Sequence, residues 1–159
     1  MTILLRAYTA ADREAAISLF MELNRFEHAI SGEALLDRAA AETGLAEAEE
    51  LVAGGEAALV LADAGGAVAG LMFWLIASGE SYVAERLRRY GKVDALVVDD
   101  RHRGQGIGTL LLEEAERLTR AAGLTRVMLH VIEGNDGAEA TYRRFGFASH
   151  SRNLAKDLG

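Results

Sequence analysis

The sequence predicts a mixed α/β domain, in which helices flank a central sheet that is partly antiparallel and partly parallel. Apolar, β-branched runs typical of strands alternate with segments whose apolar residues recur at helical spacing. One strand candidate, residues 93–98, leads through a charged turn into a glycine-rich loop and then a helix. No repeat and no Pro- or Ser-rich linker interrupts the 159 residues, so we expect a single domain over residues 1–159.

Cap and turn residues set the bounds of the predicted elements. In chain order we expect a strand over residues 3–8, helices over 10–27, 32–44 and 45–52, strands over 57–63 and 67–76, a short helix within 78–90, a strand over 93–98, a helix over 107–122, a strand over 126–132, a short helix over 136–146, and one or two last strands over 147–158.

The helices near the N-terminus are predicted from caps and apolar spacing. Thr9 and Asp12 resemble a cap that starts the first helix, and Ser31 is expected to cap the second, which ends near Gly44. The apolar residues that these two helices carry are Ala16, Leu19, Phe20, Leu23, Phe26, Leu35, Leu36 and Ala39.

The two strands that follow predict a hairpin around Gly65-Gly66. The second strand is apolar on both faces, which favours a place inside the sheet and makes Met72 and Trp74 core residues. Further along, Ile107, Leu111, Ala115, Leu118 and Ala122 form an apolar helix stripe, and Gly123 stands where a C-terminal cap is expected.

Three alternate glycines, Gly104, Gly106 and Gly108, point to an anion site at the start of this helix. Without Cβ atoms, backbone N–H groups converge on one ligand, and the first turn of the helix adds its unpaired N–H groups and its dipole. Arg101 and Arg103 bring two guanidinium groups beside the loop, which suits a pyrophosphate.

The glycine spacing separates the alternatives for this ligand. A P-loop ends in Gly-Lys-Ser/Thr, whereas here Thr109 and Leu110 follow Gly108, which disfavours triphosphate hydrolysis. A dinucleotide fingerprint is Gly-x-Gly-x-x-Gly directly after a strand, but here a polar stretch intervenes. Glu133 could still bind a ribose, so a nicotinamide or flavin enzyme stays an alternative.

Composition excludes several classes of chemistry. The chain has no cysteine, which rules out disulfides and cysteine nucleophiles, and its four histidines show no metal-ligand spacing, so no metal is expected. A net charge of −7 disfavours nucleic-acid binding. No apolar run approaches the ~20 residues of a membrane span, and the first residues lack a secretory signal, so we expect a cytoplasmic protein without membrane association.

Two motifs resemble one family. Residues 103–108, Arg-Gly-Gln-Gly-Ile-Gly, are similar to the Arg/Gln-x-x-Gly-x-Gly/Ala signature of the GNAT superfamily of N-acetyltransferases. Residues 135–147 are similar to its downstream Asn-x-x-Ala-x-x-x-Tyr-x-x-x-Gly-Phe pattern. The resemblance implies a mainly antiparallel central sheet with a splayed central strand pair, acetyl-coenzyme A as the donor, and an amine-bearing acceptor. Many members of the family pair through sheet edges or C-terminal strands, which leaves a homodimer open.

The resemblance also implies roles for single residues. Tyr142 would protonate the coenzyme A sulfur, although it also fits an amphipathic core tyrosine, and Asn135 would hold the pantetheine arm or equally serve as a helix cap. Asp94 is the candidate general base, with a solvated strand-end aspartate as the alternative. Glu27 and Glu80 are reserve bases, substrate-recognition residues or ordinary surface acids. The residues expected to contact acetyl-coenzyme A are Leu96, Val97, Val98, Arg103, Gly104, Gln105, Gly106, Ile107, Gly108, Thr109, Asn135 and Tyr142.

The leading functional hypothesis is therefore an N-acetyltransferase that moves an acetyl group from acetyl-coenzyme A to a primary amine of a small molecule or protein, by direct attack in a ternary complex. Without a cysteine, a cysteine-linked ping-pong route is excluded. A module that senses acetyl-coenzyme A without turnover and, less favoured, a dinucleotide-binding oxidoreductase are the alternatives.

Overall fold

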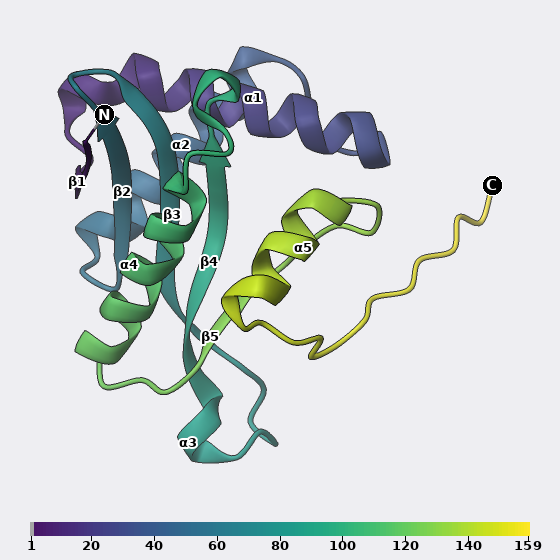
Figure 1. Ribbon diagram of the computed structural model, residues 1–159. Helices are drawn as coiled ribbons and strands as arrows, with labels where there is room; N and C mark the ends of the chain where they lie inside the picture. Colours follow the sequence, from purple (N-terminus) through teal and green to yellow (C-terminus); the bar gives the residue numbers. More distant parts are fainter. Residues whose placement is uncertain (1) are drawn as a thin grey trace.

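The central sheet of the computed structural model, which describes residues 2–159, has five strands in the spatial order β1-β2-β3-β4-β5. These strands span Ile3–Ala7, Ala57–Ala64, Val68–Ser78, Arg89–Val98 and Val127–Leu129. Strands β1 to β4 pair antiparallel, and β4 pairs parallel to β5. The mixed sheet predicted from the sequence is confirmed (Figure 1).

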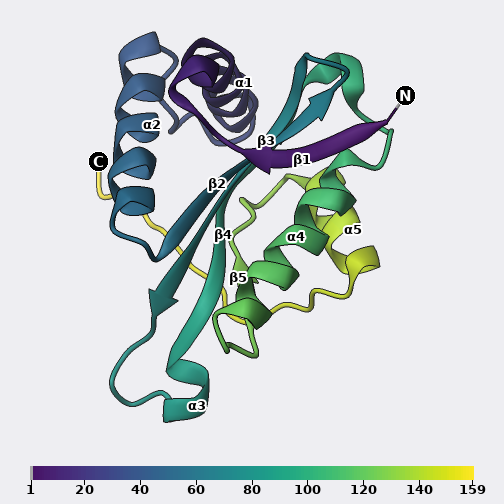
Figure 2. The ribbon, with the colours of Figure 1, turned by 90° about the vertical axis from the view of Figure 1, so that its left-hand side faces the viewer.

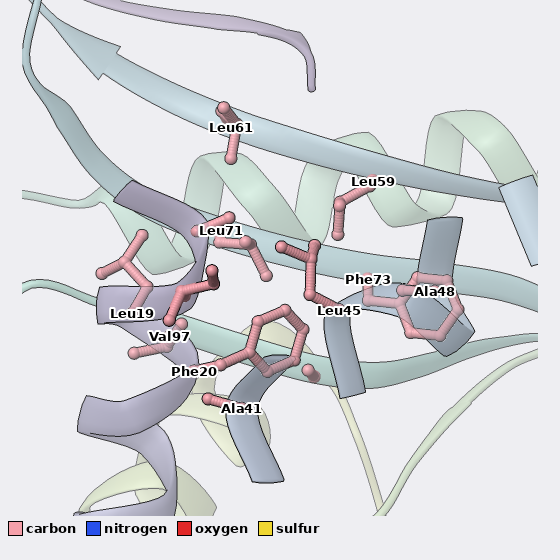
Figure 3. Packing of buried hydrophobic residues seen from close by; sticks show 13 residues of the cluster. Leu19, Phe20, Ala41, Leu45, Ala48, Leu59, Leu61, Leu71, Phe73 and Val97 are labelled. Atoms are coloured by element: carbon pink, nitrogen blue, oxygen red, sulfur yellow. The ribbon is translucent and has the colours of Figure 1, made fainter. Parts of the chain in front are cut away.

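Helices cover both faces of this sheet (Figure 2). One face packs against α1 (Arg13–Ser31) and α2 (Arg38–Ala53), where Phe20 and Leu45 meet Leu71, Phe73 and Val97 (Figure 3). The other face packs against α4 (Ile107–Ala121), whose Ile107, Leu111 and Ala115 contact a second buried cluster that holds Met72 and Trp74. Both core assignments in β3 are therefore confirmed, as is the inward stripe of α4 from Ile107 to Leu118. The last predicted stripe residue, Ala122, is exposed and follows the end of the helix.

The two N-terminal helices differ from the prediction in their bounds. A 3-10 turn, η1 (Ala10–Asp12), precedes α1, with Thr9 as its N-cap. Helix α1 then runs on to Ser31 and ends at Gly32, whose φ of 74° closes the helix in the left-handed conformation. Ser31 is thus the last residue of α1 and not the cap of the next helix. That cap is Asp37, whose carboxylate accepts the Ala40 N–H at 2.8 Å.

Helix α2 is also continuous where two pieces were expected. It passes through Gly44 without a break, because Ala41, Leu45 and Ala48 recur on one buried face. Packing of this face outweighs the ~1 kcal/mol that a glycine costs inside a helix. The predicted helical residues Leu35 and Leu36 instead lie exposed in the connection between α1 and α2.

The part of the chain after β3 contains less regular structure than the sequence predicts. Short helices α3 (Glu85–Arg88) and α5 (Asp136–Phe145) form within the expected ranges, and a 3-10 turn, η2 (Asp100–His102), precedes the glycine loop. Strand β5 covers three residues of the expected 126–132, and residues 147–158 form no strand.

The residues beyond α5 extend away from the body (Figure 1). Leu154 and Leu158 are 96% and 88% exposed, so no apolar face is buried there that would hold a strand on the sheet. No helix within residues 2–159 is long and apolar enough to cross a membrane.

Candidate functional site

Strand β4 carries a bulge at Asp94, and the sheet opens at this point. Phe73 and Trp74 of β3 are paired with Ala95 and Val93, so Asp94 is an extra residue between them. The bulge reverses the faces of β4, because Val93 packs toward α4 whereas Ala95 and Val97 pack toward α1 and α2.

Pairing with β5 ends at the same position. The last parallel pair joins Val93 to Leu129, and residues 94–98 continue with no β5 partner. This arrangement is the splayed strand pair that the family resemblance implies. It leaves the backbone edge of residues 94–98 open on the side of β5.

The glycine loop lies at the end of β4 and leads into α4. Gly104 and Gly106 have φ values of 74° and 82°, which only glycine adopts readily, and Gly106 is the N-cap of α4. A Cβ atom at Gly104, Gly106 or Gly108 would meet no protein atom within 4 Å. No side chain caps this helix, so the N–H groups of its first turn remain available to an anion.

A cleft of about 740 Å³ joins the glycine loop, the open edge of β4, the segment after β5, α5 and the C-terminal half of α1. In Figure 1, α5 lies beside β4 and below the C-terminal half of α1. The cleft brings together nearly all the residues singled out in the sequence. Those that line it are Glu27, Asp94, Leu96, Val97, Val98, Arg103, Gly104, Gly106, Ile107, Gly108, Thr109, Asn135 and Tyr142.

Of the catalytic, substrate and cofactor residues that the family resemblance implies, two lie outside the cleft lining. Gln105 turns away and is exposed, with its amide 3.4 Å from the carbonyl oxygen of Arg101. Glu80 lies between β3 and α3, at the end of β4 that is far from the glycine loop (Figure 1). Its charge is therefore not placed to bind or deprotonate a ligand in this cleft.

The two arginines of the loop have different surroundings. Arg101 is exposed and pairs with Asp99 at 2.8 Å. Arg103 is held by ion pairs with Glu22 of α1 at 2.7 Å and with Asp100 at 2.6 Å. Its guanidinium also donates to the Val98 carbonyl oxygen at 3.0 Å and lies 5.6 Å from the centre of the Phe26 ring. Of these two arginines, Arg103 lines the cleft and Arg101 does not.

Tyr142 reaches the cleft from α5. Its ring packs edge-on against Phe147, with the ring centres 6.0 Å apart. Burial raises the pKa of the Tyr142 phenol, and the nearby negative charge of Glu27 raises it further. The phenol is therefore protonated at neutral pH and has a proton to give.

Asn135 and Asp94 are each placed by their own local structure. Asn135 is the N-cap of α5, and its side-chain oxygen accepts the Ala138 N–H at 3.2 Å. The cap role is thus shown, and the same residue also faces the cleft. Asp94 is exposed at the bulge and forms an ion pair with Lys92 at 2.5 Å.

The cleft also contains residues that sequence reasoning did not assign to a site. Leu23 and Phe26 were expected in a buried helix face, yet Phe26 is partly exposed and both line the cleft together with Ile30. His130 and Arg144 line it as well. In the sequence, α1 shows an ordinary apolar stripe. Part of that stripe lines the cleft because α1 and α5 lie on opposite sides of it.

Comparisons with known proteins agree on one family. A sequence model described as the acetyltransferase (GNAT) family matches residues 18–147. A peptidyl-lysine N-acetyltransferase of Salmonella typhimurium is 45% identical over 67 residues, which is 42% of this chain and 43% of that protein. A mycothiol acetyltransferase of Salinispora tropica is 42% identical over 72 residues, 45% of this chain and 24% of that protein. The matches thus cover less than half of these relatives.

Solved structures share the fold over the whole chain. A GCN5-related N-acetyltransferase of Ralstonia eutropha superposes with a TM-score of 0.77 at 21% identity, covering 99% of this chain and 100% of that one. The structure of AAC(6')-Iy in complex with a bisubstrate analogue, CoA-S-monomethyl-acetylneamine, has a TM-score of 0.77 at 17% identity and covers 100% and 99% of the two chains.

Proposed function

Because this chain belongs to the acetyltransferase (GNAT) family, we propose that it transfers an acetyl group from acetyl-coenzyme A to a primary amine. The observation that carries the proposal is the path of the cleft. It runs from the uncapped start of α4, along the open edge of β4, to the phenol of Tyr142. A long ligand with a pyrophosphate at one end and a reactive thioester at the other fits this path.

The donor would be held mainly by backbone groups. Its pyrophosphate would sit on the N–H groups at the start of α4, with Gly104, Gly106 and Gly108 leaving room and Arg103 adding charge. Its pantetheine arm would lie along residues 94–98, where β5 has left the sheet, and Asn135 faces it from α5. The arm would thus occupy the edge of β4 along which β5 no longer pairs.

The reaction would proceed by direct attack within a ternary complex. The amine nitrogen adds to the thioester carbonyl, and a backbone N–H in the range Leu96 to Val98 stabilises the oxyanion. When the C–S bond breaks, Tyr142 gives its proton to the departing thiolate. Asp94 at the bulge accepts the proton that leaves the amine, through water, because its exposed carboxylate lies in the same cleft. The chain has no cysteine that could carry the acetyl group.

Donor binding is tested by calorimetric titration with acetyl-coenzyme A, and with NAD and NADP as controls. We expect only acetyl-coenzyme A to bind, and Gly108→Glu to abolish that binding, because it places a carboxylate in the pyrophosphate position. Gly108 has an unstrained backbone and open space around it, so the variant should fold. Ala121→Glu adds the same charge at the exposed far end of α4 and should bind like the wild type.

Turnover is tested by the release of free coenzyme A thiol in the presence of primary amines. The protein contributes no background because it contains no cysteine. Tyr142→Phe should lower kcat by about 10²-fold or more with the donor Kd unchanged. Binding of acetyl-coenzyme A without thiol release from any amine would favour the sensor alternative, and a preference for NAD or NADP would overturn the transferase.

A further inference from the structure

The donor path proposed above leaves one wall of the cleft free. It consists of four α1 residues, Leu23, Phe26, Glu27 and Ile30, at positions i, i+3, i+4 and i+7 of one helix face. Three of them are apolar and one is a carboxylate. The donor carries several phosphates and would be repelled by this acid, so the wall suits a ligand of the opposite charge.

Glu27 is the distinctive residue of this wall. Its side chain is partly buried beside the apolar residues, and no ion pair or side-chain hydrogen bond within residues 2–159 neutralises it. Burial raises the pKa of the Glu27 carboxyl, and the nearby His130 opposes this effect. A partly desolvated carboxylate without a fixed cation favours binding of a cationic ligand.

The surroundings place Glu27 near the expected point of acetyl transfer. Its charge acts on Tyr142 of α5, and His130 faces it from the segment after β5. Asp94 and Arg144 also line the cleft, from β4 and α5. An ammonium group bound by Glu27 would therefore lie on the acceptor side of the same cleft, close to the Tyr142 phenol that would protonate the leaving thiolate.

We propose that Glu27, with Leu23, Phe26 and Ile30, forms the acceptor subsite and selects a primary amine carried on an apolar stem. This inference rests on the proposed transferase function and names its substrate class. The carboxylate of Glu27 binds the ammonium of the incoming acceptor, and the apolar α1 residues pack against its alkyl or aryl stem. The ammonium releases one proton to solvent before the neutral amine attacks the thioester. An alkylamine, an arylalkylamine and a lysine side chain all offer this chemistry.

The test is calorimetric titration of the protein, both free and saturated with coenzyme A, with three related ligands. Phenethylamine carries the amine and the apolar stem, 2-phenylethanol lacks the charge, and ethylamine lacks most of the stem. Nα-acetyl-lysine amide tests whether a lysine side chain is also accepted. The variants are Glu27→Gln, which is isosteric, and Glu27→Asp, which keeps the charge on a shorter stem. Glu47→Gln removes the same charge from the exposed face of α2 as a matched control.

Phenethylamine should bind the wild type and the Glu47→Gln variant alike, and should bind Glu27→Gln about 10- to 100-fold more weakly. The affinity of the Glu27→Asp variant for phenethylamine should lie between those of the wild type and the Glu27→Gln variant. 2-Phenylethanol and ethylamine should both bind more weakly than phenethylamine, and the affinity of the alcohol should not respond to Glu27→Gln. In turnover, Glu27→Gln should raise KM for the amine far more than it lowers kcat, with the Kd for acetyl-coenzyme A unchanged.

Equal affinity of phenethylamine for wild type and Glu27→Gln would overturn the inference, and so would binding of the alcohol as tight as that of the amine. The proposed function is judged separately, by donor binding and thiol release. If acetyl-coenzyme A does not bind, the transferase is wrong while titration of the free protein still decides the subsite. If Glu27→Gln acetylates amines with unchanged KM, the transferase stands and the subsite is wrong.

Discussion

At the scale of single residues, Arg103 connects the glycine loop to α1. Its guanidinium is shared by Glu22, which is distant in sequence, and by Asp100 of the loop itself. Burial and the adjacent Asp100 raise the pKa of Glu22, while Arg103 opposes that effect. Two carboxylates thus crowd one guanidinium, and on the proposed donor path an incoming pyrophosphate would compete with both of them for Arg103.

This competition predicts opposite effects of two substitutions on donor binding. Arg103→Ala should weaken binding of acetyl-coenzyme A about 10-fold or more, because a charge-assisted bond to phosphate is lost. Glu22→Gln should strengthen it several-fold, because one competitor for the guanidinium is removed and less negative charge faces the donor. The measurement is the Kd at fixed ionic strength, with Glu47→Gln as the control for net charge. Weaker donor binding in Glu22→Gln would show instead that Glu22 is needed to orient Arg103.

The sequence singles out most of the cleft residues that lie in the glycine loop and on α5, but of the α1 residues that line the cleft it singles out only Glu27. The glycine loop is a local motif, because the left-handed backbone at Gly104 and Gly106 favours glycine whatever surrounds it. Tyr142 and Asn135 share one helix, so their spacing is also visible locally. The α1 wall depends on how α1 lies across from α5, which no local pattern encodes. Phe26 therefore reads as core in the sequence, although it faces the cleft.

At the scale of elements, α2 shows packing prevailing over local preference. Gly44 lies inside the helix, with no atom near the place of a missing Cβ and with an ordinary negative φ. The predicted break there is wrong because the buried residues on either side, Ala41 and Leu45, hold the helix against the sheet. The missing strands over residues 147–158 are the converse case, in which nothing buried supports the predicted element.

The continuity of α2 predicts that Gly44→Ala stabilises the protein. Alanine fits the available space and restricts the unfolded chain, so the free energy of unfolding should rise by about 0.5–1 kcal/mol. Urea denaturation followed by circular dichroism measures this change. Gly32→Ala, at the end of α1, is the matched control and should destabilise, because its φ of 74° disfavours a side chain. A destabilising Gly44→Ala would mean that α2 is interrupted in solution.

At the scale of the whole molecule, β4 links the packing of the sheet to the candidate site. The strand starts in close contact with α4, passes through the bulge at Asp94, and ends at the glycine loop. Near its start, the Gly91 N–H donates to the backbone carbonyl oxygen of Arg126 at 2.9 Å, and the pairing with β5 begins there. The Trp74 indole donates to the Thr119 hydroxyl at 3.0 Å just above it, which fixes α4 against the sheet.

This junction predicts that Gly91→Ala is among the costly small substitutions in the chain. A Cβ atom there would overlap the Thr119 hydroxyl and lie 2.6 Å from the indole nitrogen of Trp74. Because both groups are buried, α4 would have to move from the sheet, at a cost of about 1–3 kcal/mol. The start of α4 would move with it, so donor affinity should fall together with the melting temperature.

Thermal unfolding and titration with acetyl-coenzyme A on the same samples measure both effects. Gly79→Ala is the matched control, because a Cβ there meets only ordinary contacts at 3.6 Å or more, and it should change neither quantity appreciably. In a Thr119→Ala background, Gly91→Ala should cost less, since one of the overlapping groups is gone and the two sites are in contact. A loss of stability with unchanged donor affinity would show that the glycine loop keeps its place when the body of α4 shifts. Donor binding would then be independent of the junction at Gly91.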